Sequence, residues 1–150
     1  MKLCFAASSG GHLEEISRLV KLKAGRDCFL FTEESFEESR FCERVYYVKK
    51  IDRREQSFLL HFLLLFRESW RVFKSERPDC IITTGALAAY PISLIGKLRG
   101  CKLIYIESFA RVNSASLTGR LMYPIADLFI VQWEEGLRFF PKAVYGGGIL

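Results

Sequence analysis

Residues 3–12 read LCFAASSGGH, and this stretch decides the kind of fold that the chain can adopt. Its first half, Leu3–Ala7, is apolar throughout and indicates a strand. Its second half is a short polar loop that contains two glycines. A helical pattern follows the loop and is expected to stop at Gly25. Four apolar residues share one face of that predicted helix: Leu13, Ile16, Leu19 and Val20.

The same unit, an apolar run and then a helix-length segment, recurs along the chain. Six more runs have the length and composition of strands: 28–32, 44–48, 80–83, 103–106, 128–132 and 143–145. Helix-length segments lie at 56–77, 87–98 and 115–126. This alternation predicts an α/β fold, in which a Rossmann-like parallel sheet is covered by helices on both faces. Nothing in residues 1–150 marks a linker, so we expect a single domain.

The composition describes a folded, moderately basic protein. Half of the 150 residues are hydrophobic, which excludes global disorder. Lysine and arginine number 22 against 17 acidic residues, and the net charge of +5 suits a membrane surface or phosphorylated ligands as well as many soluble proteins. We expect no nucleic-acid partner. The apolar N-terminal run is too short for a secretory signal, so we expect the chain to stay in the cytosol.

The cysteines and histidines form no metal-binding pattern. No two cysteines have C-x-x-C spacing and most lie in apolar runs, so we expect reduced core residues. The five are Cys4, Cys28, Cys42, Cys80 and Cys101. Because His12 and His61 are the two histidines of the sequence, we expect no metal site, and we expect no cofactor.

The loop after the first strand, Ser8–His12, is the sharpest local signal. Two glycines between a strand and a helix allow a ligand to approach the backbone, and the free N–H groups of a helix start favour a diphosphate. The loop lacks the third glycine of the dinucleotide fingerprint and the G-K-[ST] of a P-loop. The alternative interpretation is a tight structural turn in which His12 caps the helix.

Two further loops follow predicted strands and are expected at the same edge of the sheet. Residues 83–86 are small and include Gly85, so they either border a ligand crevice or form a tight turn chosen for packing. Residues 107–111 follow the fifth strand. There Glu107 is placed to accept hydrogen bonds from sugar hydroxyls and Arg111 to hold a phosphate, although the two also suit a surface ion pair.

The segment 56–66 reads QSFLLHFLLLF and is apolar on nearly all sides. As a helix its eleven residues span roughly 16 Å, about half of a bilayer core, so it does not cross a membrane. Basic residues follow at 67, 71, 74 and 77. The helix is therefore either buried against the sheet or interfacial, with its basic part at lipid headgroups. Six residues would contact lipid in the second case: Phe58, Leu59, Phe62, Leu63, Phe66 and Trp70.

The last five residues are three glycines and two aliphatics, and they follow the last predicted strand. Taken alone, such a tail is most simply a frayed end. The alternative is that it docks on another protein.

Several of these motifs resemble those of the PssD-type capsular and exopolysaccharide proteins and of the eukaryotic subunit fourteen of asparagine-linked glycosylation. Both groups look like the N-terminal half of MurG, a GT-B glycosyltransferase that acts on a lipid-linked sugar. Ser9–His12 matches the family's first glycine-rich loop, and residues 84–91 look like its second. Residues 106–108 occupy the place of a further loop, and residues 127–132 fit the strand before the domain boundary.

The resemblance implies a subunit of a two-component glycosyltransferase rather than a complete enzyme. In these families the N-terminal loops hold a lipid-diphosphate sugar, here expected to be undecaprenyl-linked, and a separate catalytic subunit binds the UDP-sugar. The chain would lie on the cytoplasmic face of the membrane. Its tail would dock on the catalytic subunit through Gly146, Gly147, Gly148, Ile149 and Leu150. The implied acceptor site comprises Ser9, Gly10, Gly11, His12, Thr84, Gly85, Ala86, Glu107, Ser108 and Arg111.

Transfer requires an acceptor hydroxyl to lose its proton, and a base with a pKa near neutral suits that step. His12 is the expected catalytic base, and Glu107 is the second candidate. The eukaryotic subunit begins with a transmembrane helix, whereas here membrane attachment is expected from residues 56–77, from the lipid acceptor or from a partner protein.

Two alternatives to an acceptor-binding subunit stay open. One is a purely structural membrane adaptor without an acceptor site, which accounts for the tail and the apolar helix. The other is a nucleotide-cofactor oxidoreductase, in which Glu33 after the second strand would bind a ribose. The missing third glycine of the first loop disfavours that second alternative.

Overall fold

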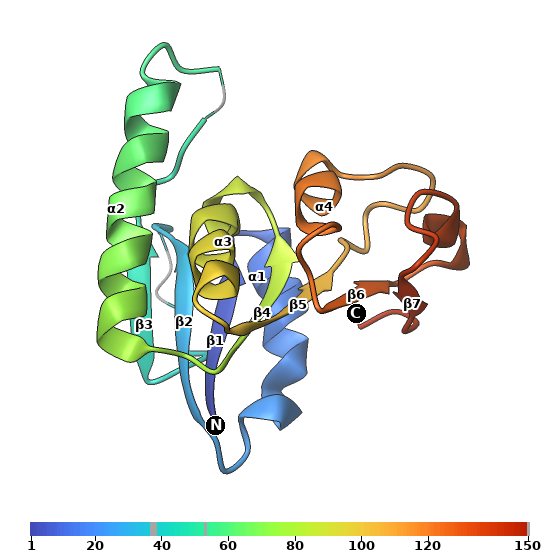
Figure 1. Ribbon diagram of the computed structural model, residues 1–150, viewed down its shortest axis with the longest axis horizontal. Helices are drawn as coiled ribbons and strands as arrows, with labels where there is room; N and C mark the ends of the chain where they lie inside the picture. Colours follow the sequence, from blue (N-terminus) through green and yellow to red (C-terminus); the bar gives the residue numbers. More distant parts are fainter. Residues whose placement is uncertain (37–38, 53, 150) are drawn as a thin grey trace.

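A parallel sheet organises the computed structural model, which describes residues 1–36, 39–52 and 54–149. Within these residues seven strands lie in the order β3-β2-β1-β4-β5-β6-β7, each parallel to its neighbours (Figure 1). The strands are β1 (Lys2–Ala7), β2 (Asp27–Glu33), β3 (Arg44–Val48), β4 (Cys80–Gly85), β5 (Lys102–Ile106), β6 (Leu128–Val131) and β7 (Val144–Tyr145). The chain builds outward from β1 to β3, then returns and builds β4 to β7 on the other side of β1.

Helices cover both faces of the sheet, so the predicted α/β fold is confirmed (Figure 1). The helical elements are α1 (Gly11–Ser17), η1 (Arg18–Lys23), α2 (Phe58–Glu76), η2 (Leu87–Ala89), α3 (Tyr90–Leu98), α4 (Leu117–Met122) and η3 (Glu134–Arg138). Alternate residues of β1 point to opposite faces. Leu3, Phe5 and Ala7 pack in one core cluster with Ile16 of α1. Cys4 and Ala6 pack in a second cluster with residues of α2 and α3.

The reversal of strand order next to β1 fixes where a ligand can bind. The connection after β1 leads toward β2, whereas β4 lies on the other side of β1. Loops that leave neighbouring strands in opposite directions open a crevice outside the carboxyl ends of those strands. The loops that follow β1 and β4 are the two glycine-containing loops identified in the sequence.

The helix after the first loop is shorter than predicted. The α-helix ends at Ser17 and tightens into the 3-10 turns of η1, with a kink at Leu19. Tightening from 3.6 to 3.0 residues per turn rotates the later side chains away from the predicted face. Val20 is therefore 54% exposed, and its assignment to the buried face was wrong.

The predicted helix at 115–126 is also shorter, because both of its ends have local causes. Ser116 caps its start by accepting a hydrogen bond from the Gly119 N–H, so the helix begins at Leu117. Tyr123 keeps a helical conformation as the C-cap, but Pro124 has no N–H to continue the hydrogen-bond ladder, so the helix ends there. Only residues 117–122 are helical in this segment.

Helix α2 is the longest element and extends past the carboxyl edge of the sheet (Figure 1). Its second half packs on the core through Leu65, Val72 and Phe73. It ends at Glu76, where Arg77 takes a left-handed conformation, with φ 47°, before Pro78. The first turns of α2 thus lie on the same side of the molecule as the loops of the crevice.

Candidate functional site

The first loop turns sharply out of β1 into α1. Gly10 has φ 82° and ψ −139°, a conformation that residues with a Cβ avoid, and this is why glycine is needed there. Gly10 is also the N-cap of α1, and no described side chain caps the first turn. The N–H groups of that turn therefore have no side-chain acceptor within the described residues. The arrangement suits an anion.

A hydrogen bond brings the second loop against the first. The Thr84 hydroxyl donates to the carbonyl oxygen of His12 at 2.7 Å. Gly85 has φ 102°, and a Cβ at this position would lie 2.8 Å from the Tyr105 hydroxyl oxygen. Ala86 then has φ 65° and ψ 162°, a combination that is almost confined to glycine and that strains the backbone. The two loops form one surface at the carboxyl edge.

His12 does not cap the helix, because the N-cap position belongs to Gly10. Its Nδ1 is buried and has no hydrogen-bond partner among the described residues. The ring is itself partly exposed.

Glu107 is held by groups of the protein itself and is 3% exposed. One carboxylate oxygen, Oε1, accepts from the Ser108 N–H at 3.0 Å and from the Tyr105 hydroxyl at 3.5 Å. The other, Oε2, accepts from the hydroxyl and the N–H of Ser116, at 3.0 and 3.4 Å. Burial, followed by the charge of Glu107, raises the pKa of Tyr105, so its hydroxyl stays protonated and can donate. Glu107 thereby ties the third loop to the start of α4.

A second buried carboxylate, Glu15 of α1, holds the third loop from the other side. Its Oε1 accepts from the Ser108 hydroxyl at 2.9 Å and from the Phe109 N–H at 3.1 Å. Its Oε2 accepts from the Gln132 amide at 3.1 Å. The sequence analysis missed Glu15 and Gln132, and the one signal available was a carboxylate three residues after His12, on the same side of the helix.

Arg111 lies apart from these carboxylates. Its guanidinium is exposed and donates to the Ser114 hydroxyl at 3.4 Å. The surface ion pair with Glu107, which was the alternative interpretation, is not formed. The structure therefore brings together the predicted residues of the three loops, with Arg111 on the solvent side of the third.

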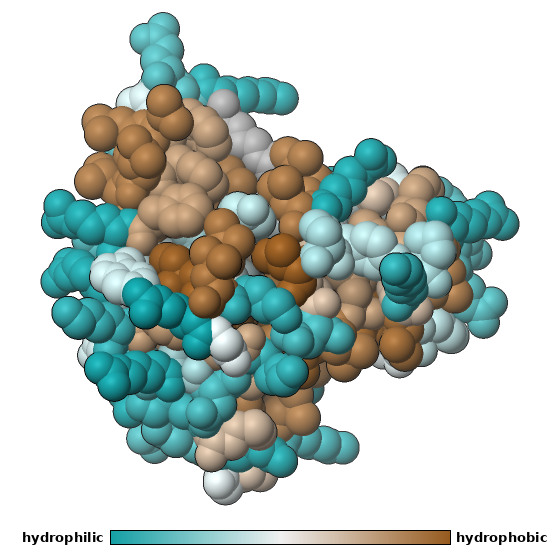
Figure 2. Space-filling model, in the orientation of Figure 1, coloured by the Kyte–Doolittle hydropathy of each residue, from teal (hydrophilic) through white to brown (hydrophobic). Residues whose placement is uncertain are grey.

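The predicted membrane residues divide into two sets along α2. Phe58, Phe62 and Phe66 are half-buried, and their rings pack on one another at centroid distances of 5.5 and 5.2 Å. Leu59 is 68% exposed, and Leu63 and Trp70 are exposed with it. Leu60 and Leu64 extend this apolar surface, which Figure 2 shows at the end of α2 that projects beyond the sheet. No helix of the described residues is long and apolar enough to cross a membrane.

The C-terminal tail lies along its own chain as far as residue 149. The Gly146 N–H donates to the Val131 carbonyl at 3.0 Å, and the Ile149 N–H donates to the Gln132 side chain at 2.9 Å. A Cβ on Gly148 would lie 3.0 Å from the ring of Phe109, so glycine allows the tail to pass the third loop. Ile149 packs against the core cluster under α1. Leu150, the last residue of the predicted interface, lies outside the described residues.

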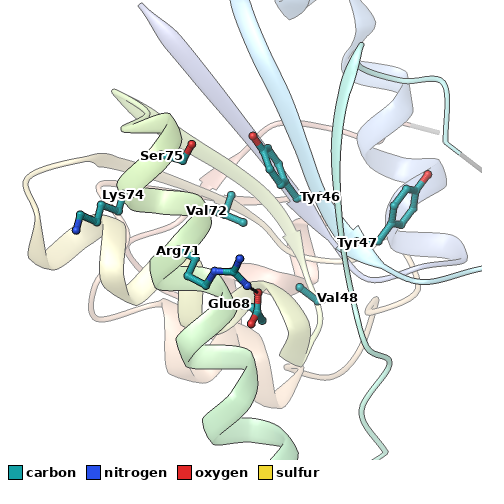
Figure 3. Close-up of a pocket in the computed structure, with 8 residues that line it drawn as sticks. All are labelled: Tyr46, Tyr47, Val48, Glu68, Arg71, Val72, Lys74 and Ser75. Carbon is teal, nitrogen blue, oxygen red and sulfur yellow. Dashed lines mark hydrogen bonds and ion pairs between the residues drawn. The ribbon is translucent and has the colours of Figure 1, made fainter.

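Two sizeable surface pockets lie away from the second and third loops, and one of them borders the first loop. One of about 610 Å³ lies between β3 and α2, where Tyr46 and Val48 lie on the same side as Arg71 and its ion-pair partner Glu68, while Tyr47 points to the other side of the strand (Figure 3). None of the predicted site residues lines it. Another, of about 560 Å³, borders Gly10 and Leu13 on the outer side of α1. No residue of the second or third loop lines either of these two pockets.

Comparison with known sequences gives one family. The family model described as "Oligosaccharide biosynthesis protein Alg14 like" matches residues 3–149. Proteins named UDP-N-acetylglucosamine transferase subunit ALG14 are similar to this chain. The protein of Candida albicans is 30% identical, over 97% of this chain and 77% of its own length. That of Rattus norvegicus is 29% identical, over 99% and 82%. That of Kluyveromyces lactis is 47% identical over 45% of this chain and 28% of its own length.

Solved structures show the same fold in larger proteins. MurG of Acinetobacter baumannii superposes with a TM-score of 0.68 at 18% identity, over 87% of this chain and 40% of its own. UDP-GlcNAc 2-epimerase of Neisseria meningitidis, bound to UDP-GlcNAc, superposes with a TM-score of 0.76 at 12% identity, over 99% and 47%. The chain therefore spans less than half of each of these proteins. At these identities the likeness shows a GT-B N-terminal fold and nothing finer.

Proposed function

Because this chain belongs to the Alg14-like family of oligosaccharide biosynthesis proteins, we propose that it is the acceptor-binding, membrane-recruiting subunit of a two-component UDP-sugar glycosyltransferase. The observation that carries this proposal is a juxtaposition. Three strand-end loops meet at the carboxyl edge of the sheet, and the exposed apolar turns of α2 project beyond that same edge. A lipid-linked substrate has a polar head and an apolar tail, and such a surface offers a place for each.

The first two loops would hold the diphosphate of the acceptor. The uncapped first turn of α1 offers N–H groups, and Gly10 and Gly11 leave the backbone open, because a Cβ on either would meet no atom within 4 Å. Thr84 would hold this loop in place through the hydrogen bond from its hydroxyl to the His12 carbonyl oxygen. Arg111, whose guanidinium is exposed, would close on the phosphates from the third loop.

His12 would act as the base that takes the proton of the attacking hydroxyl. With Nδ1 buried, Nε2 would accept that proton, and the attacking oxygen would bond to the anomeric carbon as the UDP leaves. Glu107 suits this task less well, because both of its oxygens already accept hydrogen bonds from the protein. Its role would be to hold the third loop in place.

The apolar turns of α2 would rest in the membrane interface. Full burial of a leucine side chain is worth about 1.5–3 kcal/mol, so a few such residues give reversible attachment. The basic residues that follow on the same helix would lie at anionic headgroups. The chain would thus be peripheral on the cytoplasmic face of the membrane.

A separate catalytic subunit would supply the UDP-sugar site. Its contact would include the tail from Gly146 to Leu150. The part of this tail that the structure describes, as far as Ile149, lies beside the third loop, so a partner bound there would be next to the acceptor. Undecaprenyl diphosphate as the carrier, and a capsular or exopolysaccharide as the product, are the finer parts of this proposal. They rest on the resemblance of the loop motifs to PssD-type proteins.

The test is reconstitution of sugar transfer. A lipid-diphosphate sugar and UDP-sugars are incubated with this chain, with the protein encoded beside it, and with both together. Activity that requires the mixture supports the proposal. Full activity from this chain alone contradicts it, because the donor site would then lie within these 150 residues. If variants of Gly11 and His12 leave the mixture fully active while changes in the tail abolish activity, the chain is an adaptor without an acceptor site.

A further inference from the structure

Three carboxylates are buried at the carboxyl edge of the sheet, and they differ in what surrounds them. Glu15, Glu33 and Glu107 are 4%, 6% and 3% exposed. An ionised carboxylate has about four acceptor positions. Burying a carboxylate without hydrogen-bond donors or a counter-charge costs free energy. The groups that donate to each buried carboxylate therefore indicate how that cost is offset.

Two of the three are fully accounted for by the protein. Glu15 accepts from a hydroxyl, a backbone N–H and an amide group, with both of its oxygens engaged. Glu107 accepts from the N–H of Ser108 and the hydroxyl of Ser116, each at 3.0 Å, so each of its oxygens has a well-placed donor, and longer contacts from Tyr105 and the Ser116 N–H add to these. A Cβ on Gly119 would collide with Oε2 of Glu107, so this carboxylate has little room for a ligand.

Glu33 is the exception. Its carboxylate receives one contact within the described part of the chain, from the Ser9 hydroxyl at 3.4 Å, which is long for a hydrogen bond between oxygens. No lysine, arginine or histidine of the described residues lies within ion-pair distance of it. Glu33 therefore lacks the donors that the other two carboxylates have.

The position of Glu33 explains why a ligand can supply those donors. It is the last residue of β2, at the carboxyl edge, and its contact is with Ser9 of the first loop. Phe29 and Phe31, two and four residues earlier on β2, point into the core under α2 and α3, so Glu33 points to the same face. On that face β2 contacts η2, the turn that follows the second loop. Glu33 thus lies between the two loops proposed to hold the acceptor.

We propose that Glu33 binds the acceptor's sugar by accepting hydrogen bonds from its hydroxyl groups. This inference rests on the proposed function. A phosphate is the wrong partner, because it would add negative charge to an uncompensated carboxylate. Neutral hydroxyls supply the missing donors without that repulsion. The diphosphate would then lie on the backbone of the first loop, and the sugar would extend toward the end of β2.

The test measures binding with two probes that differ only in the sugar. One is a short-chain isoprenyl diphosphate, and the other is the same molecule carrying one N-acetylglucosamine, both in detergent micelles with calorimetric detection. Wild type is expected to bind the sugar-bearing probe at least about tenfold more tightly, and Glu33→Gln to lose that preference. Glu34→Gln is the matched control, because Glu34 is adjacent but exposed. A third probe, NAD, should not bind.

The outcomes separate the two proposals. If wild type binds both probes equally, the role of Glu33 is wrong while diphosphate binding stands. If it binds neither, the acceptor site itself is wrong, and Glu33 with it. Preferential binding of NAD would assign Glu33 to a ribose and overturn both.

Thermal melting distinguishes a binding role of Glu33 from a structural one. A structural role predicts that Glu33→Gln lowers the melting temperature. Removing a buried charge that has one weak partner should leave the melting temperature of Glu33→Gln equal to or above that of wild type. A fall of several degrees would mean that the carboxylate stabilises the fold, and would overturn the proposal. Glu33→Asp, which keeps the charge, should recover part of the sugar preference.

Discussion

The two edges of the sheet differ in whether every buried polar group has a partner, because Glu33 at the carboxyl edge lacks the donors that Glu15 and Glu107 have. At the amino edge, buried Glu76 accepts from the Tyr46 hydroxyl at 2.6 Å and from Lys2 Nζ at 3.0 Å, with Arg44 Nε at 3.3 Å. At the carboxyl edge, Glu33 has one long contact, and His12 Nδ1 has no partner among the described residues. Removing one partner of a compensated buried charge destabilises a fold, whereas uncompensated groups keep capacity for a ligand. The comparison assigns stability to the amino edge and binding to the carboxyl edge.

The largest expected effect is on activity, from His12→Ala at the carboxyl edge. Loss of a general base lowers the rate by a factor of about 10² to 10⁴. The turnover number of the reconstituted pair should fall by that factor, while the melting temperature and partner binding stay unchanged. His61→Ala is the control, because His61 lies on α2. A His12→Ala variant with normal turnover would remove His12 from the chemistry.

Membrane attachment should depend on the exposed leucines of α2. The double variant Leu59→Gln/Leu63→Gln removes two exposed apolar side chains without opening the core, so vesicle affinity should fall at least about tenfold and stability should not change. Co-sedimentation with liposomes measures this. The matched double variant Val20→Gln/Leu22→Gln alters exposed apolar residues of η1 and should bind vesicles normally. Equal loss in both would indicate non-specific adhesion.

At the amino edge, Glu76→Gln should reduce stability and spare activity. The change removes the charge that Lys2 and Arg44 face, and both partners are partly exposed, so we expect a loss of about 2 kcal/mol rather than the larger cost of a fully buried pair. Urea denaturation at neutral pH measures the loss. Glu68→Gln, at an exposed pair with Arg71, should change stability by less than about 0.5 kcal/mol.

Low pH should reduce the stability of the amino edge, because it protonates Asp127. A hydrogen bond from Lys97, with the Leu103 N–H next, holds the pKa of Asp127 at about 2. The unfolded value is about 3.9, so the stabilisation is complete above pH ~4 and is lost as the pH falls toward 2. Asp127→Asn should cost about 1–2 kcal/mol at pH 7 and nearly nothing at pH 2. A constant difference between the two pH values would contradict this.

The smallest effect is a gain, from Ala86→Gly in the second loop. Glycine adopts φ 65° and ψ 162° without strain, and the relief of about 1 kcal/mol or more outweighs the added freedom of the unfolded chain. The melting temperature should rise by about 2–4 °C. Ala89→Gly, at an ordinary φ of −81°, should lower it instead. A destabilised Ala86→Gly would mean that the loop is not strained.

The sequence predicts the fold well because the signals for strands and loops are local. Apolar runs such as Leu3–Ala7 form buried strands, and Gly10 and Gly85 have positive φ at the two predicted loops. The errors are also local in origin. Val20 is exposed because η1 tightens after Ser17, and apolar periodicity alone does not distinguish 3.6 from 3.0 residues per turn over so few residues.

The candidate site was less predictable because its partners are distant in sequence. Ser108 and Gln132 bond to Glu15 across 93 and 117 residues, and no spacing rule relates such positions. Glu107 was expected to face a ligand because it follows a strand. Several carboxylates lie at the carboxyl edge. Which of them lacks hydrogen-bond donors from the protein depends on the groups that the folded chain places around it.

The place of β1 between β2 and β4 has a consequence in time. Its second neighbour, β4, begins 77 residues after Leu3, because Leu3 pairs with Cys80. At synthesis rates of about 5–20 residues per second, roughly 4–15 seconds pass before that neighbour has been made. Throughout this interval one edge of β1, which is buried from Leu3 to Ala7, has no strand beside it. A nascent chain therefore spends those seconds as a target for chaperones, and slow codons before residue 85 should increase its aggregation.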